Sequence, residues 1–491
     1  MTFIDTLNDR RVNRTLFYAI VICALSVLVC RLCLLFSYSP DIAGLEEFQL
    51  ILLKLTYKSG NPYTLLNKPP CLAVPYAPFY YHALTTIFRF LPIDINNVRS
   101  IYIAGRSTNL FLNLVNVFVI YIVCREFGMN KIFSIGTALI FFIFLFFDHY
   151  AVRPDTLKLF FVSLHLLFTI KAVKKDKGYL YVILSSFFLC CAVFTKQDSL
   201  QLLLPATLSF FLLCENRILK LAIFSITFIF SLLCFLYLMG FDRELLKVTA
   251  TSIYWGMYTG INLKYFLMTS VLGFIIPFMP LIVISFVCGY RLMADKALQN
   301  PVLKMLPLYV GLSFIFSFAF SLRLGAMPVY YAEFMLFMLL LLAVNYSLSP
   351  KKKSLGLAVF YATMLTLLTL YFTNNKMGPD LKVKFEQSEE ISKTVLKKVP
   401  QGLMFSYDPL IDVFIADRLS APNLGYEFYR HWFYTEGYQI ETVNYNEMLH
   451  CDEPQWLIAT EKDEMQAYIK KMDLPYAFDQ SGSGYFLFVR K

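Results

Sequence analysis

Near the N-terminus, residues 16–37 read LFYAIVICALSVLVCRLCLLFS, an apolar run that contains one charged side chain, Arg31. A helix needs about 20 predominantly apolar residues to cross about 30 Å of hydrocarbon. This run has that length, and the basic residues Arg10, Arg11 and Arg14 precede it. We therefore expect it to be the first membrane-spanning helix of the protein.

The rest of the chain has a similar composition. Of its 491 residues, 58% are hydrophobic and 16% are charged, and the mean hydropathy is +0.58. Soluble domains contain about 45–50% apolar and about 25% charged residues. The composition therefore excludes a soluble multidomain enzyme, a disordered chain and a nucleic-acid-binding protein. The net charge of +10 is typical of a membrane protein with Lys and Arg on its cytoplasmic side.

Ten further segments have the composition of spans, which predicts a polytopic α-helical membrane protein with about eleven transmembrane helices. The eleven segments are residues 16–37, 101–124, 130–148, 156–173, 179–195, 199–214, 218–239, 265–290, 302–322, 328–346 and 354–372. If the N-terminus is cytoplasmic, every connection on the cytoplasmic side contains basic residues, including the Lys351–Lys353 run, as the positive-inside rule requires. We place the protein as a multi-pass protein in a bacterial cell (inner) membrane, because no retention or eukaryotic targeting motif occurs.

This topology makes residues 38–100 a long extracytoplasmic loop. Apolar residues at helical spacing from Leu45 to Leu55 predict an amphipathic helix on the membrane, with Glu46, Gln49 and Lys54 facing away. The later apolar stretch Pro78–Leu91 reaches only about 21 Å at 1.5 Å per residue, which is too short to span. We expect that stretch to be an interfacial or re-entrant helix.

Residues 374–491 differ from the rest in being polar and mixed in charge. Their patterns predict strands at 403–407, 456–459 and 484–490 and helices at 409–416 and 462–472. A segment of this size can hold its own core. We therefore expect two domains, a transmembrane module over residues 1–373 and a small extracytoplasmic α/β domain over residues 374–491.

Ionisable side chains of both signs gather at the outer ends of the predicted spans. They are Asp41, Glu46, His149, Arg153, Asp155, Lys196, Asp198 and Arg323, the last near Tyr330 and Tyr331. Charges near a bilayer are costly and mark functional sites. The set predicts an acid–base site beside an anion site, opening outward, whereas His165 near mid-span predicts an interhelical hydrogen bond.

Most of these residues also have a purely structural interpretation. Asp41 and Asp155 each begin a helix and would satisfy its unpaired N–H groups. Glu46 would be favoured by the dipole at a helix start. Lys196 would form a surface ion pair, and Arg323 would extend to the interface. The functional hypothesis rests on the shared depth of the set.

The order of motifs resembles the GT-C glycosyltransferases, and within them the glycosyltransferase family 39-like branch of protein O-mannosyltransferases and the bacterial lipid A aminoarabinose transferase. The motifs are Pro40-Asp41 with Glu46, Asn61-Pro62-Tyr63, Tyr76-Ala77-Pro78-Phe79-Tyr80-Tyr81, Ala104-Gly105-Arg106, Arg153-Pro154-Asp155 and Thr195-Lys196-Gln197. They cover roughly residues 10–215. The resemblance implies a GT-C-like catalytic module in residues 1–373.

The resemblance also implies a mannosyltransferase-like reaction. The donor would be a sugar on a polyprenyl or dolichyl phosphate, and the acceptor a hydroxyl of a lipid, glycan or protein outside the cell. Asp41 would be the base that activates this hydroxyl, with inversion at the sugar. Asp155 is implied as a second catalytic acid in the next outer loop, and Glu46 accompanies Asp41 in the first.

The donor phosphate needs cations, because negative charge grows on it as it leaves. Arg153, Lys196 and Arg323 are the candidates from the sequence. The resemblance adds Lys68, which precedes the paired prolines Pro69-Pro70. The motif residues Tyr80 and Tyr81 complete the predicted substrate-binding set.

We expect no required cofactor and no metal site. If a divalent ion takes part, Asp41, Glu46 and Asp155 would supply oxygen ligands of the type it prefers. Two other functions stay open. A lipid-linked glycan polymerase or ligase would share the outer site, and a secondary transporter would show repeated halves with ionisable groups near the midplane.

Overall fold

The structure is a computed structural model that describes residues 10–37, 45–60, 77–145, 151–238, 263–294, 300–322, 328–348, 359, 361–368, 381–399, 401–406, 408–418, 455–459, 462–471, 475–482 and 485–491. The chain divides into two compact units. Unit 1 comprises Met1–Leu32, Asn109–Tyr150 and Pro154–Thr373. Unit 2 comprises Cys33–Thr108, Ala151–Arg153 and Asn374–Lys491.

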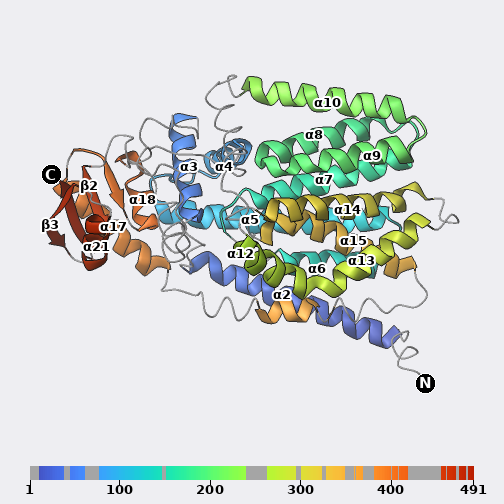
Figure 1. Ribbon diagram of the computed structural model, residues 1–491, viewed down its shortest axis with the longest axis horizontal. Coiled ribbons are helices and arrows are strands. Elements are labelled where there is room, and N and C mark those ends of the chain that lie inside the picture. The colour runs from blue at the N-terminus through green and yellow to red at the C-terminus, as the bar shows by residue number, and fades with distance from the viewer. Residues whose placement is uncertain are drawn as a thin grey trace. The chain divides into compact units, whose positions relative to one another are not determined.

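Unit 1 is a bundle of apolar helices (Figure 1). In chain order its elements are α2 (Arg10–Phe36) and α5 (Val98–Glu126), each for most of its length, α6 (Lys131–Phe144), α7 (Asp155–Lys174), α8 (Tyr179–Thr195), η2 (Gln197–Leu202), α9 (Leu203–Leu213), α10 (Arg217–Leu238), α12 (Leu263–Phe266), the π-helix η3 (Leu267–Ile275), α13 (Ile276–Ala294), α14 (Pro301–Ser321), η4 (Pro328–Tyr331) and α15 (Ala332–Leu348).

Local sequence fixes where several of these helices begin. The side chain of Asn130 accepts a hydrogen bond from the backbone N–H of Phe133 and caps α6. Asn300 caps α14 in the same way through the N–H of Val302, and Pro301 occupies the first turn, where its missing N–H costs nothing. Both caps stand directly before apolar runs, so they place the helix starts that the sequence predicts.

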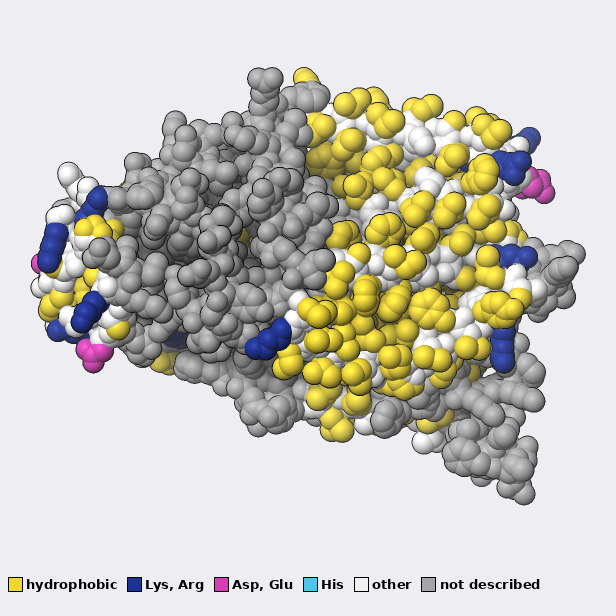
Figure 2. Space-filling view, in the orientation of Figure 1, with side chains coloured by type: hydrophobic (Ala, Val, Ile, Leu, Met, Phe, Trp, Pro, Cys, Tyr) yellow, Lys and Arg dark blue, Asp and Glu magenta, His cyan; other side chains and the backbone are white. Residues whose placement is uncertain are grey.

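The bundle has the surface of a membrane protein. Six described helices are long and apolar enough to cross a membrane, namely Arg14–Phe36, Val98–Glu126, Asp155–Lys174, Arg217–Leu238, Leu267–Ala294 and Pro301–Ser321. Figure 2 shows hydrophobic side chains over the bundle and Lys and Arg at the end where α9 connects to α10. On α10, Ile226, Phe230 and Tyr237 are all more than half exposed, as lipid-facing residues are.

The polytopic helical class predicted from the sequence is confirmed, but the count of eleven spans is not. Three more apolar helices are shorter than the six, at Lys131–Phe144, Tyr179–Thr195 and Ala332–Ser347. The predicted segment 199–214 forms η2 followed by the 11-residue helix α9. His165 lies fully buried, with its ring nitrogens 3.0 Å from the Ser185 carbonyl and the Tyr309 hydroxyl, which confirms the interhelical hydrogen bond.

Unit 2 contains a four-stranded mixed sheet. Its strands are β1 (Met404–Ser406), β2 (Trp456–Ala459), β3 (Tyr476–Gly482) and β4 (Tyr485–Arg490), in the order β1-β2-β4-β3. β1 and β2 are parallel and the other pairs are antiparallel. Leu457, Ala459 and Phe488 from the sheet pack with Met465 of α21 (Lys462–Lys471) in one core, as in a small α/β domain.

The other helices of unit 2 come from both the outer loop and the C-terminal segment. They are α3 (Leu45–Ser59), α4 (Phe79–Phe90), α17 (Leu381–Lys398) and α18 (Pro409–Phe414), with the single turn η5 (Ala416–Arg418). The Phe385 ring of α17 lies edge-on to Tyr102, with centroids 5.3 Å apart. The amine of Lys54 on α3 donates to the Val413 carbonyl of α18 at 2.8 Å. The C-terminal segment therefore packs directly on helices of the first loop.

Helix α3 begins where the sequence predicts, but the expected exposed polar face is wrong. Glu46, Gln49 and Lys54 are 0%, 1% and 5% exposed. Gln49 accepts a hydrogen bond from the Tyr81 hydroxyl at 2.7 Å, and Lys54 reaches α18. These polar groups are buried because each has a partner that lies far away in the sequence.

The buried amine of Lys54 predicts a pH-dependent stability of unit 2. Burial and the nearby Lys58 charge lower the pKa of Lys54 to about 8. Because the unfolded chain keeps its proton up to about pH 10.4, the unfolded state binds more protons between these values. Stability should therefore rise with pH from about 8 to about 10.4. Thermal unfolding of the purified chain and of Lys54→Met across this range measures the effect, and identical pH profiles would contradict it.

Candidate functional site

Five ionisable side chains of unit 1, four of them buried and Asp198 partly buried, meet where α7, α8, η2 and α15 begin or end. They are Asp155 and Lys158 of α7, Lys196 after α8, Asp198 of η2 and Glu333 of α15. We refer to these five residues as the charge cluster. Three carboxylates face two amines, so the cluster carries one unbalanced negative charge when all groups are ionised.

The distances within the charge cluster are those of strong ion pairs. The Lys196 Nζ lies 2.6 Å from Asp155 Oδ1 and 3.7 Å from Asp198 Oδ2. The Lys158 Nζ lies 2.7 Å from Glu333 Oε1, 3.1 Å from Asp198 Oδ2 and 3.8 Å from Asp155 Oδ1. Each amine therefore bridges carboxylates from different helices, which holds the ends of these helices in register.

Burial makes this arrangement costly. The side chains of Lys158 and Glu333 have no exposed surface, and those of Asp155 and Lys196 are 2% and 7% exposed. Removing charges from water costs several kcal/mol per ion unless they are paired with good geometry. Five such groups in an apolar bundle therefore indicate a functional requirement.

Local structure places each end of the Asp155–Lys196 pair. Asp155 is in the first turn of α7, where a carboxylate is favoured by the helix dipole. Lys196 follows α8 in extended conformation, and its Nζ lies 4.9 Å from the centroid of the Tyr330 ring. A cation over an aromatic face is stabilised further. Lys196 thus presents its charge between a carboxylate and a tyrosine ring.

The short helix η2 adds polar atoms that could receive a ligand. Gln197 Nε2, Asp198 Oδ1, Ser199 Oγ and Gln201 Oε1 are buried, and none has a hydrogen-bond partner among the residues that the structure describes. Buried polar groups normally find a partner. Donors and acceptors gathered beside the charge cluster could bind the hydroxyl groups of a sugar.

Unit 2 contains a second buried ion pair, between Glu46 of α3 and Arg106 of α5. Arg106 donates from Nε to Glu46 Oε1 at 2.8 Å and from Nη2 to Oε2 at 2.6 Å. The Val152 N–H donates to the same Oε1 at 2.9 Å, and Arg106 Nη1 donates to the Leu34 carbonyl at 2.5 Å. The Tyr102 ring lies 4.2 Å from the guanidinium carbon. The pair therefore ties together four segments of unit 2.

This geometry bears on the roles expected from the sequence. Both oxygens of Glu46 accept strong hydrogen bonds, so the carboxylate is not free to take a proton from a substrate. Val152 precedes Arg153, which is itself 6% exposed. Through the Val152 N–H, Glu46 thus also contacts the segment that carries Arg153.

Tyr80 and Tyr81 of α4 are fully buried, and their rings pack edge to face with centroids 5.6 Å apart. The Tyr81 hydroxyl is engaged by Gln49, as described above. Asp41, Lys68 and Arg323 lie outside the described residues, as does His149. Of the predicted site residues, Asp155 and Lys196 therefore meet in unit 1, and Glu46 lies in a separate ion pair of unit 2.

Sequence reasoning missed Lys158 and Glu333. Lys158 stands three residues after Asp155, a spacing that places both on one helix face, and it interrupts a predicted span. Glu333 follows Tyr330 and Tyr331 at the start of another apolar run. An ionisable residue inside an apolar helix was the signal that could have identified both.

Within the part of the chain that the structure describes, no group of three or more His, Cys, Asp or Glu side chains is arranged to hold a metal ion. The carboxylates of the charge cluster instead point to Lys amines. Asp41, which the sequence offers as an oxygen ligand, is outside that part.

Known proteins resemble this chain in sequence and in fold. Residues 98–241 match the model of the family described as dolichyl-phosphate-mannose-protein mannosyltransferase. The match includes α7, α8 and η2, and hence four of the five residues of the charge cluster. No curated protein matches the sequence significantly.

Two solved structures share the fold over nearly the whole chain. ArnT from Cupriavidus metallidurans, bound to undecaprenyl phosphate, has a TM-score of 0.61 at 12% identity, covering 95% of this chain and 97% of its own. The archaeal oligosaccharyltransferase AglB from Archaeoglobus fulgidus, in complex with an inhibitory peptide and a dolichol-phosphate, has a TM-score of 0.51 at 11% identity, covering 98% and 75%. The chain therefore has the fold of the GT-C membrane glycosyltransferases, as the motif series in its first half predicts.

Proposed function

We propose that the protein is an integral-membrane glycosyltransferase that moves a sugar from a polyprenyl-phosphate donor to an acceptor hydroxyl at the extracytoplasmic face. The observation that carries the proposal is the charge cluster, of which four of the five residues lie inside the segment that matches the mannosyltransferase family. Such a cluster offers both an anion-binding amine and carboxylates in an apolar bundle. A scaffold protein would have no use for it.

The donor class is supported by what the structural neighbours bind. ArnT was solved with undecaprenyl phosphate and AglB with a dolichol-phosphate, each a long isoprenoid with one phosphate. Such a molecule needs an apolar slot for its tail and a cation at the interface. In this chain Lys196 is the described cation best suited to the phosphate, since Asp155 and Tyr330 fix its amine.

In the proposed reaction, the Asp41 carboxylate takes the proton of the acceptor hydroxyl as its oxygen attacks the anomeric carbon. The bond from that carbon to the phosphate oxygen breaks on the opposite face, so configuration inverts. The electron pair leaves with the phosphate, whose growing charge Lys196 and Arg153 stabilise. The products are the glycosylated acceptor and the free lipid phosphate.

The other charges position this machinery. Asp155 holds the Lys196 amine by a 2.6 Å hydrogen bond, and Lys158 ties Asp198 and Glu333 to the same place. The unpaired polar atoms of Gln197, Ser199 and Gln201 are proposed to bind sugar hydroxyls. Each of these groups acts by holding the donor or its binding residues in place.

A direct test incubates the purified protein with a panel of polyprenyl-phosphate sugars that differ in hexose or pentose, and follows release of the lipid phosphate by mass spectrometry. One or more donors should release it in the presence of an acceptor lipid, glycan or peptide. A polyprenyl-diphosphate-linked glycan is included as a separate donor. Release of lipid diphosphate from it, with no release of lipid phosphate from the monophosphate donors, would instead indicate a polymerase or ligase. Transport of a solute without any release would indicate a transporter.

A Lys196→Met variant should separate donor binding from acceptor binding. The loss of the amine removes a cation from the phosphate, so we expect the KM for the donor to rise at least about tenfold and kcat to fall by about 10²-fold. The KM for the acceptor should change little. A Lys177→Gln variant, at an exposed lysine between α7 and α8, is the control. An equal loss for both substrates would contradict the phosphate-binding role.

A further inference from the structure

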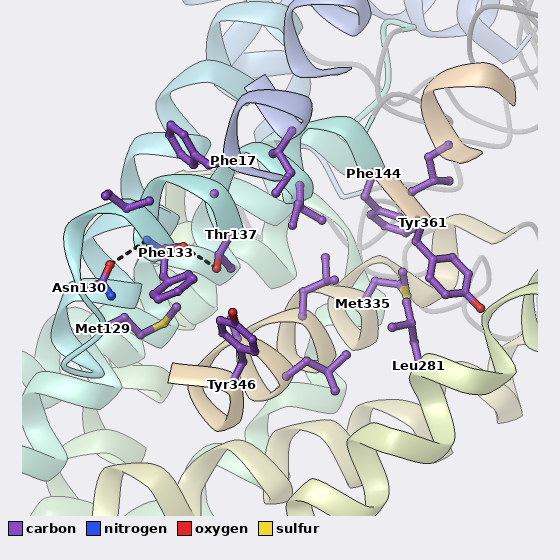
Figure 3. A pocket seen from close by; sticks show the side chains of 18 of the residues that line it. Phe17, Met129, Asn130, Phe133, Thr137, Phe144, Leu281, Met335, Tyr346 and Tyr361 are labelled. Carbon is purple, nitrogen blue, oxygen red and sulfur yellow. Dashed lines mark hydrogen bonds between the residues drawn. The ribbon is translucent and has the colours of Figure 1, made fainter. Parts of the chain in front are cut away.

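A large apolar groove in unit 1 is separate from the charge cluster. Its volume is about 720 Å³, and α2, α6, α13, α15 and the helical residues 361–368 line it. Figure 3 shows Met129 and Asn130 at one end and Phe144 and Tyr361 at the other, with Phe133 and Tyr346 between. The groove follows α6 from Lys131 to Phe144, which is about 20 Å at 1.5 Å per residue.

The charged groups of the groove are confined to one end. Arg14 of α2 and Lys131 of α6 line it, and both are exposed. Neither cation forms an ion pair with any residue that the structure describes. Among the described residues that line the groove, none is acidic, and none near Phe144 and Phe278 at the opposite end is charged. The groove therefore combines an apolar channel with a positively charged mouth.

The positive-inside rule assigns this mouth to the cytoplasmic leaflet, because the basic connections of the bundle lie at the same end. The start of α6 adds the positive end of a helix dipole, since Asn130 caps that helix at the mouth. An acyl chain fits the apolar length, and an anionic head group fits the two cations. A polyprenyl phosphate would place its phosphate at the far end, where the groove has no cation.

We propose that this groove is a binding site for an anionic phospholipid of the cytoplasmic leaflet, with its head group at Arg14 and Lys131 and an acyl chain along α6. The site is independent of the proposed transferase reaction. A lipid bound there fills the space between α2, α6 and α15. A bound lipid would thereby add contacts between α6 and α15. These helices already meet where the Phe133 ring packs against the Tyr346 ring, with centroids 5.0 Å apart.

The test measures lipid retention rather than activity. The purified full chain is loaded with phosphatidylglycerol or with phosphatidylcholine of the same acyl chains, and native mass spectrometry counts the lipid that survives delipidation. Phosphatidylglycerol should be retained more strongly. Arg14→Gln and Lys131→Gln should each weaken its binding about fivefold, and the double variant about thirtyfold, from the attraction of each basic residue to an anionic lipid.

Two further variants keep the test decisive. Ala343→Phe adds a ring to the lining, leaves Arg14 and Lys131 unchanged, and should reduce the retention of both lipids. Lys177→Gln removes a basic residue outside the lining and should change nothing. Equal retention of the two lipids, or unchanged retention in the double variant, would overturn the proposal. Displacement of phosphatidylglycerol by an equimolar polyprenyl phosphate would also overturn it and assign the groove to the donor.

Discussion

A Lys158→Met variant is expected to lose about 3–5 kcal/mol of stability, because the change leaves buried carboxylates without their cation. The Lys158 amine touches Glu333, Asp198 and Asp155, and none of its own surface is exposed. Methionine fills the same volume with no charge. The charge cluster would then hold three carboxylates against the single amine of Lys196.

A double variant distinguishes lost charge balance from lost packing. Glu333 is fully buried, and Lys158 is the partner that its carboxylate contacts at 2.7 Å. Replacing both by apolar residues, as Lys158→Met with Glu333→Leu, restores the original net charge of the cluster. Because buried pairs replaced by hydrophobic residues are often neutral for stability, most of the loss should be recovered. Thermal unfolding in detergent measures both variants, and a double variant no more stable than the single one would refute the argument.

An Asp41→Asn variant is expected to lose about 10²–10⁴-fold in the rate of sugar transfer while it inserts and folds normally. The carboxamide has nearly the shape of the carboxylate but does not accept the proton of the acceptor hydroxyl. Single-turnover release of lipid phosphate measures the loss. Full activity in this variant would sink the assignment of Asp41 as base.

Glu46→Gln provides the matched control, since it makes the same chemical change five residues later in the same loop. Glu46 accepts two hydrogen bonds from Arg106 and one from Val152, all inside unit 2. Its neutralisation removes the carboxylate that the buried Arg106 guanidinium contacts through two hydrogen bonds, so we expect a loss of stability of about 3–5 kcal/mol. Asp41→Asn should therefore slow sugar transfer without loss of stability, whereas Glu46→Gln should lower the stability of the fold. Equal stability of both proteins would contradict the structural role of Glu46.

The helices and strands were largely predictable where sequence pattern and burial agree. The strands at 404–406, 456–459 and 485–490 and the helices α18 and α21 lie within a residue or two of their predicted positions. Strand β3 was missed because all seven of its residues, YAFDQSG, are half-buried or exposed, which weakens the alternation of apolar and polar side chains. Helix α17 was missed because its polar residues outnumber the few that pack, such as Phe385.

The candidate site was predictable only in part, because its members come together from distant helices. Asp155, Lys196 and Asp198 stand at span ends, where charge is conspicuous in the sequence. Lys158 and Glu333 lie inside apolar runs, and their ion pair joins helices that are far apart in the sequence. The prediction that the polar face of α3 is exposed was wrong for the same reason. Its polar groups bond to Arg106, Tyr81 and Val413, and no local sequence pattern reveals these distant partners.

The pairing of Lys158 with Glu333 has a consequence for biogenesis. Helix α7 is synthesised well before α15. The Lys158 ammonium is therefore in the nascent chain while α8 to α14 insert, before Glu333, the carboxylate nearest to it, has been made. Asp155 and Asp198 are the acids available to it in the meantime. A truncation that stops short of α15 should therefore be recognised by membrane proteases as unfinished, even though all its earlier helices have already been inserted.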